Sequence, residues 1–363
     1  MKVVQLLPEL NEGGVERGVV ELNREFVKRG IESVVISAGG RQASQIGADG
    51  GHHICLDVAA KNPLTAWQRV RLLRKQFDHL QPDVIHARSR APAWLSYLAN
   101  RHQRPFVTTV HGFNSVNRYS RIMTQGDRVI CVSGAIRDFV IKHYQVPEDR
   151  LVVIPRGIDL ELFNPDRLDQ EFMADFKKRY DLEEKCVVTT VGRITQLKDL
   201  ETFIAAVIEL KRQLPKVVGL IVGGVHEHKK DYYRILQGLV AEHNAEQYIH
   251  FTGSQNKVAE IYALTDVVVS SSKKPESFGR SAAEALAMNV PVAASSHGGM
   301  LDIVLPGQTG QLFNPGDVSG LTKGIVACQN LSRESLRTFV QENFSLDHMV
   351  DETLCVYRAL ISV

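Results

Sequence analysis

Short runs of Val, Ile and Leu recur along the chain and alternate with longer stretches of helical periodicity. In the first half these runs predict strands at 2–7, 33–38, 83–87, 106–110, 128–133 and 151–155. In the second half they predict strands at 186–192, 218–224, 249–253, 266–272 and 291–295. The runs are nearly all apolar, which is typical of strands covered on both faces. The pattern therefore predicts an α/β fold built on doubly wound parallel sheets.

The stretch "PRGIDLELFNPDRLDQEF" separates the two series of strands and indicates an interdomain connection, because it carries Pro155, Gly157 and Pro165 ahead of a polar helix. A chain of 363 residues is also too long for one ordinary core. We predict a first domain over 1–165, a second over 166–343, and an amphipathic helix over 344–363 that packs on the first domain. Ligands of such sheets bind beyond the carboxyl ends of the strands, so we expect the site in a cleft between the domains.

The composition, with 44% hydrophobic and 23% charged residues, is that of an ordinary globular protein. The five cysteines are odd in number and scattered, without a C-x-x-C pair, which predicts reduced thiols. The chain shows no signal-peptide pattern and no run of 18 apolar residues. We therefore expect a cytoplasmic protein, at most peripheral to the inner face of the plasma membrane.

The net charge of +2 hides an asymmetry between the two halves. Residues 1–165 hold 22 Lys and Arg against 16 Asp and Glu, a net +6, and the remainder holds 21 against 25, a net −4. A basic first half suggests an anionic partner such as a phospholipid surface or a phosphorylated glycan, with ordinary scatter of surface charge as the alternative. In "WQRVRLLRKQ", Arg69, Arg71, Arg74 and Lys75 form either a membrane-facing patch or one solvated helix face. We expect no nucleic-acid partner.

Two motifs follow strands in the first half. In "PELNEGGVERGVVEL", Gly13 and Gly14 precede a helical pattern, where glycines let backbone N–H groups approach an anion; a simple tight turn is the alternative. The turn is not a G-x-G-x-x-G, so the nicotinamide fingerprint is missing. In "VTTVHGFN", His111 ends a strand, which places an imidazole at the carboxyl edge facing the expected cleft; a satisfied structural histidine is the alternative.

Cations and carboxylates follow strands in the second half. Arg193 and Lys198 flank a strand-to-helix turn in "VGRITQLKDLETF", where they would grip a diphosphate from one side; a pair of solvated surface charges is the alternative. In "KKPESFGRSAAEALAM", Gly279 permits a close backbone approach, and a helix that begins near it would point its positive end at the same diphosphate. Glu276 can then reach a sugar hydroxyl, and Glu284 can accept hydrogen bonds from a ribose diol.

The sequence does not predict a metal site. It contains no D-x-D, and the "HEH" of His226–His228 has two imidazoles without a convincing third ligand, which favours a surface loop. We expect neither a metal nor another cofactor.

Six segments in order resemble the retaining glycosyltransferases of family 4: "GGVE", "TTVHG", "IPRGID", "VGRITQLKDL", "ESFGRSAAE" and "HGGMLDIVLPGQTGQLFNPGD". The resemblance covers essentially the whole chain and implies the GT-B fold, two Rossmann-like domains facing across a cleft with a C-terminal helix crossing back to the first. It implies metal-independent transfer of a hexose-type sugar from a nucleotide diphosphate sugar to a glycan or lipid-linked acceptor, with an α-glycosidic bond formed. A UDP-sugar is favoured and a GDP-sugar comes second, with lipopolysaccharide biosynthesis as the setting.

The resemblance also implies roles for individual residues. Those given catalytic roles are Arg193 and Lys198 at the leaving diphosphate, Glu276 at the transferred sugar, and His111 at its outer hydroxyl. The residues given donor-binding roles are Gly14, Phe278 and Gly279, each through its backbone amide, and Glu284, which binds the ribose. The acceptor-binding residues are unknown. Two positions depart from the family: Arg156 stands where many relatives carry Asn, and Met300 where a small or polar residue is common.

Two other kinds of function stay open at this point. One is an epimerase or a phosphorylase on the same fold, and a phosphorylase would need a lysine-bound pyridoxal cofactor. The other is a non-catalytic nucleotide-sugar-binding protein. The presence of Arg193, Lys198, Glu276 and Glu284 together argues against the second, because folding needs no such set.

Overall fold

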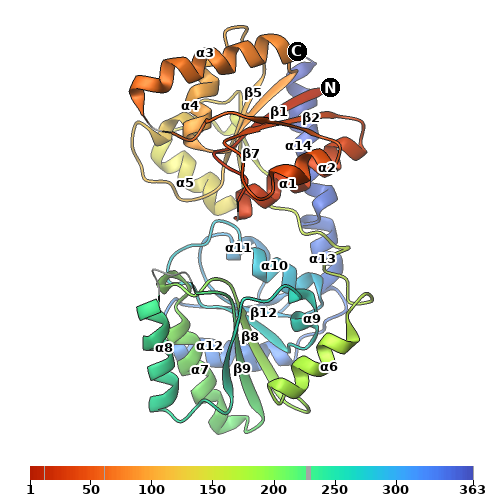
Figure 1. Cartoon of the computed structure of the whole chain (residues 1–363). Helices are drawn as coiled ribbons and strands as arrows, with labels where there is room; N and C mark the ends of the chain where they lie inside the picture. The colour runs from red at the N-terminus through yellow and green to blue at the C-terminus, as the bar shows by residue number, and fades with distance from the viewer. Residues whose placement is uncertain (12, 61, 226–229, 363) are drawn as a thin grey trace. The chain divides into compact units, whose positions relative to one another are not determined.

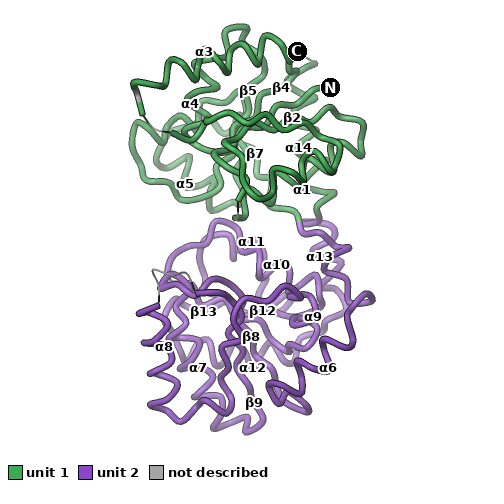
Figure 2. Tube along the Cα trace, in the orientation of Figure 1, with its two compact units in different colours: residues 1–157, 346–363 green, residues 158–345 purple. Residues whose placement is uncertain are grey.

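The computed structural model describes residues 1–11, 13–60, 62–225 and 230–362. They divide into two compact units (Figure 2), the first made of residues 1–157 and 346–363 and the second of residues 158–345. From the sequence we predicted that the chain passes from one domain to the next after residues 165 and 343. In the structure the connecting segment after Gly157 belongs to the second unit.

The described part of the first unit is built on a seven-stranded parallel sheet with the order β3-β2-β1-β4-β5-β6-β7. Its strands are β1 Lys2–Leu6, β2 Glu32–Ser37, β3 His52–Cys55, β4 Val84–Ala87, β5 Phe106–Val110, β6 Arg128–Cys131 and β7 Leu151–Val153. Its helices are α1 Gly14–Lys28, α2 Ala43–Ala48, α3 Pro63–Leu80, α4 Arg90–Ala99, α5 Gly134–Tyr144 and α14 Leu346–Ile361, with two short 3-10 turns at Ser120–Thr124 and Glu148–Arg150 (Figure 1). The sequence pattern missed β3, whose "HHIC" has no apolar run and stays partly exposed.

The C-terminal helix α14 completes the core of the first unit. Its apolar face, including Val350 and Tyr357, packs in one cluster with Phe26 of α1 and with residues of the sheet. The Tyr357 ring meets the Phe26 ring edge-on at 6.0 Å, and its hydroxyl lies 2.5 Å from Nδ1 of His86 on β4. The amphipathic pattern of the tail thus has its partner in the first unit, and the expected crossing of the C-terminal helix back to the first domain is confirmed.

The second unit is built on a six-stranded parallel sheet in its described part, with the order β10-β9-β8-β11-β12-β13. Its strands are β8 Cys186–Val191, β9 Val217–Val222, β10 Ile249–Gly253, β11 Val267–Ser270, β12 Val292–Ser295 and β13 Gly310–Phe313. Its helices are α6 Gln170–Arg179, α7 Leu200–Gln213, α8 Lys230–Glu242, α9 Val258–Ala263, α10 Arg280–Ala287, α11 Met300–Ile303, α12 Val318–Gln329 and α13 Leu336–Asn343, with a 3-10 turn at Gln196–Lys198. The "GQLF" of β13 was not predicted from sequence.

Helices cover both faces of this second sheet. Val267 and Val269 of β11 lie in the cluster formed with α7, α8 and α12. Val268, between them, lies in the cluster formed with α10, α11 and α13. Because successive side chains of a strand point to opposite faces, the sheet is buried on both. The doubly wound parallel sheet predicted from the apolar runs is therefore confirmed for this unit. None of the helices in the described ranges is both long and apolar enough to cross a membrane.

Candidate active site

The turn from β8 to α7 holds Lys198 at the carboxyl edge of the second sheet. The strand ends at Val191, and Gly192 follows with a φ of +150°. A Cβ on Gly192 would lie 3.1 Å from Cε of Lys198, so the lysine side chain runs directly across the glycine. The Ser271 hydroxyl, just after β11, donates to the Lys198 carbonyl oxygen at 2.9 Å. The turn is thereby tied to the neighbouring strand.

Glu276 meets Lys198 at this edge. Lys198 Nζ lies 2.6 Å from Glu276 Oε1, and the Ser272 and Ser270 hydroxyls donate to the same oxygen at 2.5 and 3.4 Å. Burial alone would raise the pKa of Glu276, but the Lys198 ammonium and these hydrogen bonds lower it below its ordinary value of 4.5. The carboxylate is thus held ionised at neutral pH. Its second oxygen, Oε2, accepts no hydrogen bond from the described residues.

Two glycines of the "HGGM" motif bring a further loop against Glu276. The Gly299 N–H donates to the Glu276 carbonyl oxygen at 2.8 Å. Gly298 has a φ of +62°, and a Cβ there would lie only 2.4 Å from the same oxygen. Side chains at these positions would push the loop away, so the glycine pair fixes the backbone of Glu276.

Helix α10 begins beside Glu276. Its N-cap residue, Gly279, has a φ of +116°, a conformation that side chains rarely adopt. Phe278 is buried against Phe344, with 5.8 Å between ring centroids, so only its backbone can address a ligand. Met300, the residue that departs from the family, is 1% exposed and packs against Gly279, where a Cβ would lie 2.9 Å from its sulfur. In this structure Met300 is a core side chain.

Glu284 lies in α10, between the buried Ala283 and Ala285. It is 6% exposed and accepts a hydrogen bond from the hydroxyl of the fully buried Tyr262 at 3.2 Å. Sequence reasoning did not find Tyr262, which is 22 positions away on another helix. Arg193, in contrast, is exposed, and within the described ranges it makes no ion pair. The structure therefore joins Lys198 directly to Glu276, but it joins neither Arg193 nor Glu284 to that pair.

His111 lies at the carboxyl edge of the first sheet, directly after β5. It borders a cavity of about 290 Å³ whose lining residues are Pro8, Val15, Glu16, Arg88, Ser89, Arg90, Thr109, His111, Gly112, Asn114 and Met123. Burial, followed by the nearby charges of Arg156 and Arg88, lowers the pKa of His111 well below its usual range, so the ring is neutral at pH 7. Its Nε2 is buried and has no hydrogen-bond partner among the described residues.

Arg156, the other departure from the family, joins two predicted residues of the first unit. Its Nη2 lies 3.3 Å from Nδ1 of His111, and its Nη1 donates to the carbonyl oxygen of Gly14. Gly14 is the exposed first residue of α1. The arginine thus fixes the His111 ring against the first βα turn.

Two arginines of the same cavity were missed in the sequence. Arg88 is 6% exposed, and its Nη1 lies 3.4 Å from both ring nitrogens of His86. Arg90 is partly buried, with its Nη1 donating to Ser120 Oγ at 3.2 Å. Arg88 directly follows the strand β4 and Arg90 begins α4 two residues later, so the strand-end criterion that selected His111 would also have selected them.

The predicted basic patch on α3 is smaller than expected. Arg69 is only 7% exposed and donates to the carbonyl oxygens of Asn62, at 2.8 Å, and of Ala60. Arg69 stabilises the preceding loop, and for this residue both alternatives, a membrane-facing patch and a solvated helix face, were wrong. Arg71 and Lys75 are exposed.

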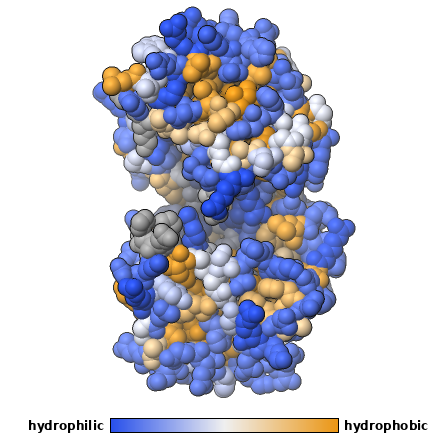
Figure 3. All heavy atoms as spheres, in the orientation of Figure 1, coloured by the Kyte–Doolittle hydropathy of each residue, from blue (hydrophilic) through white to orange (hydrophobic). Residues whose placement is uncertain are grey.

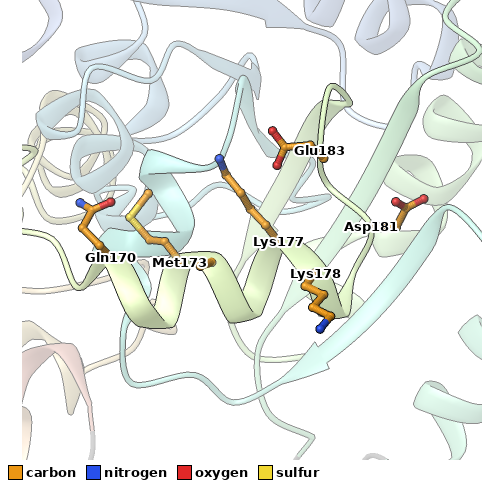
Figure 4. Close-up of a pocket in the computed structure, with 7 residues that line it drawn as sticks. Gln170, Met173, Lys177, Lys178, Asp181 and Glu183 are labelled. Atoms are coloured by element: carbon orange, nitrogen blue, oxygen red, sulfur yellow. The ribbon is translucent and has the colours of Figure 1, made fainter.

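A further hollow, of about 510 Å³, lies along α6 (Figure 4). Lys177 and Glu183 extend to the same side of the helix, and Lys178 extends to the other. None of the residues predicted for the site lines this hollow. The "HEH" at 226–228 lies outside the described residues, and the ranges that are described hold no cluster of three or more His, Cys, Asp or Glu suited to a metal ion.

Comparison with known proteins agrees with this architecture of two parallel sheets. The profile of "Glycosyltransferase Family 4" matches residues 12–162, and that of "Glycosyl transferases group 1" matches residues 172–341. The chain belongs to glycosyltransferase family 4 and has the GT-B fold.

Three relatives show how far the likeness extends. A glycosyltransferase structure from Rickettsia africae is 27% identical, with a TM-score of 0.91 over 99% of this chain and 98% of that one. The Anabaena HepE structure in complex with UDP is 20% identical, with a TM-score of 0.84 over 99% of this chain and all of that one, which bears on the fold alone. A GDP-mannose-dependent mannosyltransferase acting on phosphatidylinositol monomannoside, from Mycolicibacterium smegmatis, is 28% identical over 49% of this chain. The chain spans 60%, 47% and 57% of the length of three curated relatives.

Proposed function

We propose that this protein transfers a hexose-type sugar from a nucleotide diphosphate sugar to a glycan or lipid-linked acceptor, with an α-glycosidic bond formed and the configuration retained. The observation that carries the proposal is the Lys198–Glu276 contact of 2.6 Å at the carboxyl edge of the second sheet. The contact lies beside the first turn of α10, whose N–H groups favour a negative ligand. Membership of the family supports the same reaction.

The reaction proceeds as a displacement in which the acceptor oxygen attacks C1 on the same face of the sugar that the diphosphate leaves. The bond between C1 of the sugar and the β-phosphate oxygen breaks, and the acceptor oxygen forms its bond to C1. The acceptor hydroxyl gives its proton to the departing diphosphate. Negative charge grows on that diphosphate in the transition state, where Lys198 and Arg193 stabilise it without a metal. No carboxylate is assigned as a covalent nucleophile.

The remaining predicted residues bind and orient the donor. Oε2 of Glu276 accepts from hydroxyls of the transferred sugar, while Oε1 stays with Lys198. Glu284 takes the ribose diol, with Tyr262 holding its carboxylate. The neutral His111 offers Nε2 to the sugar's outer hydroxyl. The backbone amides of Gly14, Phe278 and Gly279 contact phosphate or sugar oxygens.

The donor we favour is a UDP-sugar, with a GDP-sugar second. The HepE structure of the same fold contains UDP, and the Mycolicibacterium relative uses GDP-mannose. We place the reaction in the synthesis of a lipopolysaccharide-type glycan in the cytoplasm, with peripheral contact at an anionic membrane. The basic first half of the chain supports that contact.

A screen of nucleotides and nucleotide sugars tests the proposal. We expect one nucleoside diphosphate and its sugar to raise the melting temperature, because a ligand that binds only the folded state stabilises it. The sugar should then be transferred only when an acceptor is added. Conversion of the donor without an acceptor would indicate an epimerase, and a yellow pyridoxal chromophore would indicate a phosphorylase. Binding without transfer would leave a non-catalytic protein, and a sugar trapped covalently on a side chain would refute the one-face displacement.

A further inference from the structure

Arg88 is a buried cation for which the described residues provide no anionic partner. Its side chain is 6% exposed and lines the cavity beside His111, and its Nε is buried without a hydrogen-bond partner. Burial lowers its pKa to about 10, which still leaves the guanidinium charged at neutral pH. A buried charge costs free energy unless an opposite charge compensates it. The arrangement indicates that a ligand supplies the negative charge.

The cavity as a whole is suited to an anion. Arg90 lines it together with Arg88, and Nη2 of Arg156 lies 3.3 Å from Nδ1 of His111. Among the described residues that line this cavity, Glu16 is the only carboxylate. Because an arginine can present two parallel N–H groups to one phosphate, the pair of arginines fits a phosphate group better than a neutral sugar.

A second cavity, of about 490 Å³, adjoins the first through Arg90, which lines both. Its wall is mainly apolar and includes Ala66, Trp94, Leu95 and Leu98. The guanidinium of Arg90 lies 5.7 Å from the centre of the Tyr119 ring, which also lines this second cavity. A basic compartment and an apolar one therefore meet at a single side chain.

The surface next to the apolar cavity is also hydrophobic. On α3, which contributes Ala66 to the wall, Leu64 is 88% exposed and Trp67 is 66% exposed. Leu98 of α4 is 45% exposed. Figure 3 shows hydrophobic side chains at the surface over the N-terminal end of α3. A cluster of large, exposed apolar side chains around an apolar cavity is typical of a binding surface.

From these observations we propose that the acceptor is a phosphorylated lipid. Its phosphate binds Arg88 and Arg90 in the basic cavity, and its hydrocarbon chain lies in the apolar cavity between α3 and α4. The sugar is accepted by a hydroxyl that the lipid carries beyond its phosphate; this binding places that hydroxyl beside His111, and its proton goes to the departing diphosphate. The inference rests on the proposed function and narrows it, because it names the class of acceptor and the residues that select it.

Isothermal titration calorimetry on the full chain tests the proposal with three probes: farnesyl phosphate, farnesol and inorganic phosphate. We expect farnesyl phosphate to bind at least about tenfold more tightly than either of the others, because it alone fills both cavities. Arg90→Gln should weaken farnesyl phosphate binding about tenfold or more. Leu98→Asp should weaken it similarly and leave the binding of inorganic phosphate unchanged.

Arg128→Gln is the matched control. Arg128 is the first residue of β6, so it lies at the amino ends of the strands, whereas the basic cavity lies at their carboxyl ends. The substitution removes the same charge. Its affinity for farnesyl phosphate should stay within about twofold of the wild-type value. Equal affinity for farnesol and farnesyl phosphate would overturn the proposal. So would farnesyl phosphate binding that is insensitive to Arg90→Gln while phosphatidylglycerol vesicles retain the protein, since the face would then contact membrane lipid.

The same titrations separate this inference from the proposed function. UDP and GDP are titrated into the wild type and into Arg90→Gln, and we expect the same nucleotide affinity in both. If the wild type binds a nucleotide but does not prefer farnesyl phosphate, the lipid acceptor is refuted and the glycosyl transfer stands. If it binds no nucleotide, the proposed function itself fails.

Discussion

Lys198 and Glu276 touch at 2.6 Å, and we predict that they act as one unit in turnover. The perturbation is a double-mutant cycle of Lys198→Met and Glu276→Gln. Methionine keeps the apolar stem that crosses Gly192 and removes only the ammonium. Glutamine keeps the shape of Glu276 and removes its charge. Both side chains are mostly shielded from water, with 25% of Lys198 and 20% of Glu276 exposed, so their interaction is not fully screened.

The expected magnitudes follow from what each group does. Loss of one preorganised donor at a developing negative charge costs about 2.7–4 kcal/mol, so Lys198→Met should lower kcat by about 10²–10³-fold. Glu276→Gln should lower kcat by about 10²-fold with nucleotide binding nearly intact, because its partner is the sugar. The double variant should lose little more than Lys198→Met alone, which corresponds to a coupling free energy of about 1–3 kcal/mol.

The assay is release of nucleoside diphosphate from the donor that the binding screen identifies, measured across pH. In Lys198→Met the pKa of Glu276 should rise, because burial remains and the ammonium is gone. The acid limb of its kcat profile should therefore move to higher pH. Lys274→Met, an exposed lysine two positions before Glu276, is the control and should change kcat less than about threefold. Normal turnover in either single variant, or losses that simply multiply in the double variant, would refute the reasoning.

Three further predictions concern residues around this pair and in the first unit. Glu284→Gln should abolish the preference for UDP over 2′-deoxyuridine diphosphate, measured by calorimetry; unchanged discrimination would remove Glu284 from the ribose. Tyr357→Phe should lower the free energy of unfolding by about 1–3 kcal/mol in urea, because it leaves His86 without its 2.5 Å partner. Tyr97→Phe, at a 50% exposed position, should cost less than about 0.5 kcal/mol. The folded-state pKa of Glu276 lies below its ordinary 4.5, so its contribution to stability is complete above that pH and is lost as pH falls through the lower value. The stability difference between wild type and Glu276→Gln should therefore shrink in acid; a difference independent of pH would contradict the assignment.

The sequence predicted most of the fold because buried parallel strands leave long apolar runs. The runs at 186–192 and 266–272 contain β8 and β11. The two missed strands, β3 and β13, lie at sheet edges, and their short sequences carry only one or two apolar residues in a row. Strand pairing, rather than local pattern, defines such edge strands.

The site was predictable where strand ends carry charged residues, and less so where distant side chains meet. Lys198 and Glu276 were both chosen for following strands, and they are in contact. The hydrogen bond of Tyr262 to Glu284 joins two helices and leaves no local signal. Arg69 was predicted to lie either in a membrane-facing patch or on a solvated helix face, but it turns back to carbonyl oxygens of the preceding loop. Only the three-dimensional path of that loop reveals this.

The chain passes from one unit to the other twice, after Gly157 and after Ser345. The Gly157 N–H donates to Met349 Sδ at 3.1 Å in the first unit, and the Ile158 N–H donates to the Phe344 carbonyl oxygen at 2.8 Å in the second. The first half of the protein thus leaves the ribosome lacking the helix that carries Tyr357 into its core. The second unit has all its residues earlier, so it can mature during translation, while the first unit must wait until α14 is synthesised.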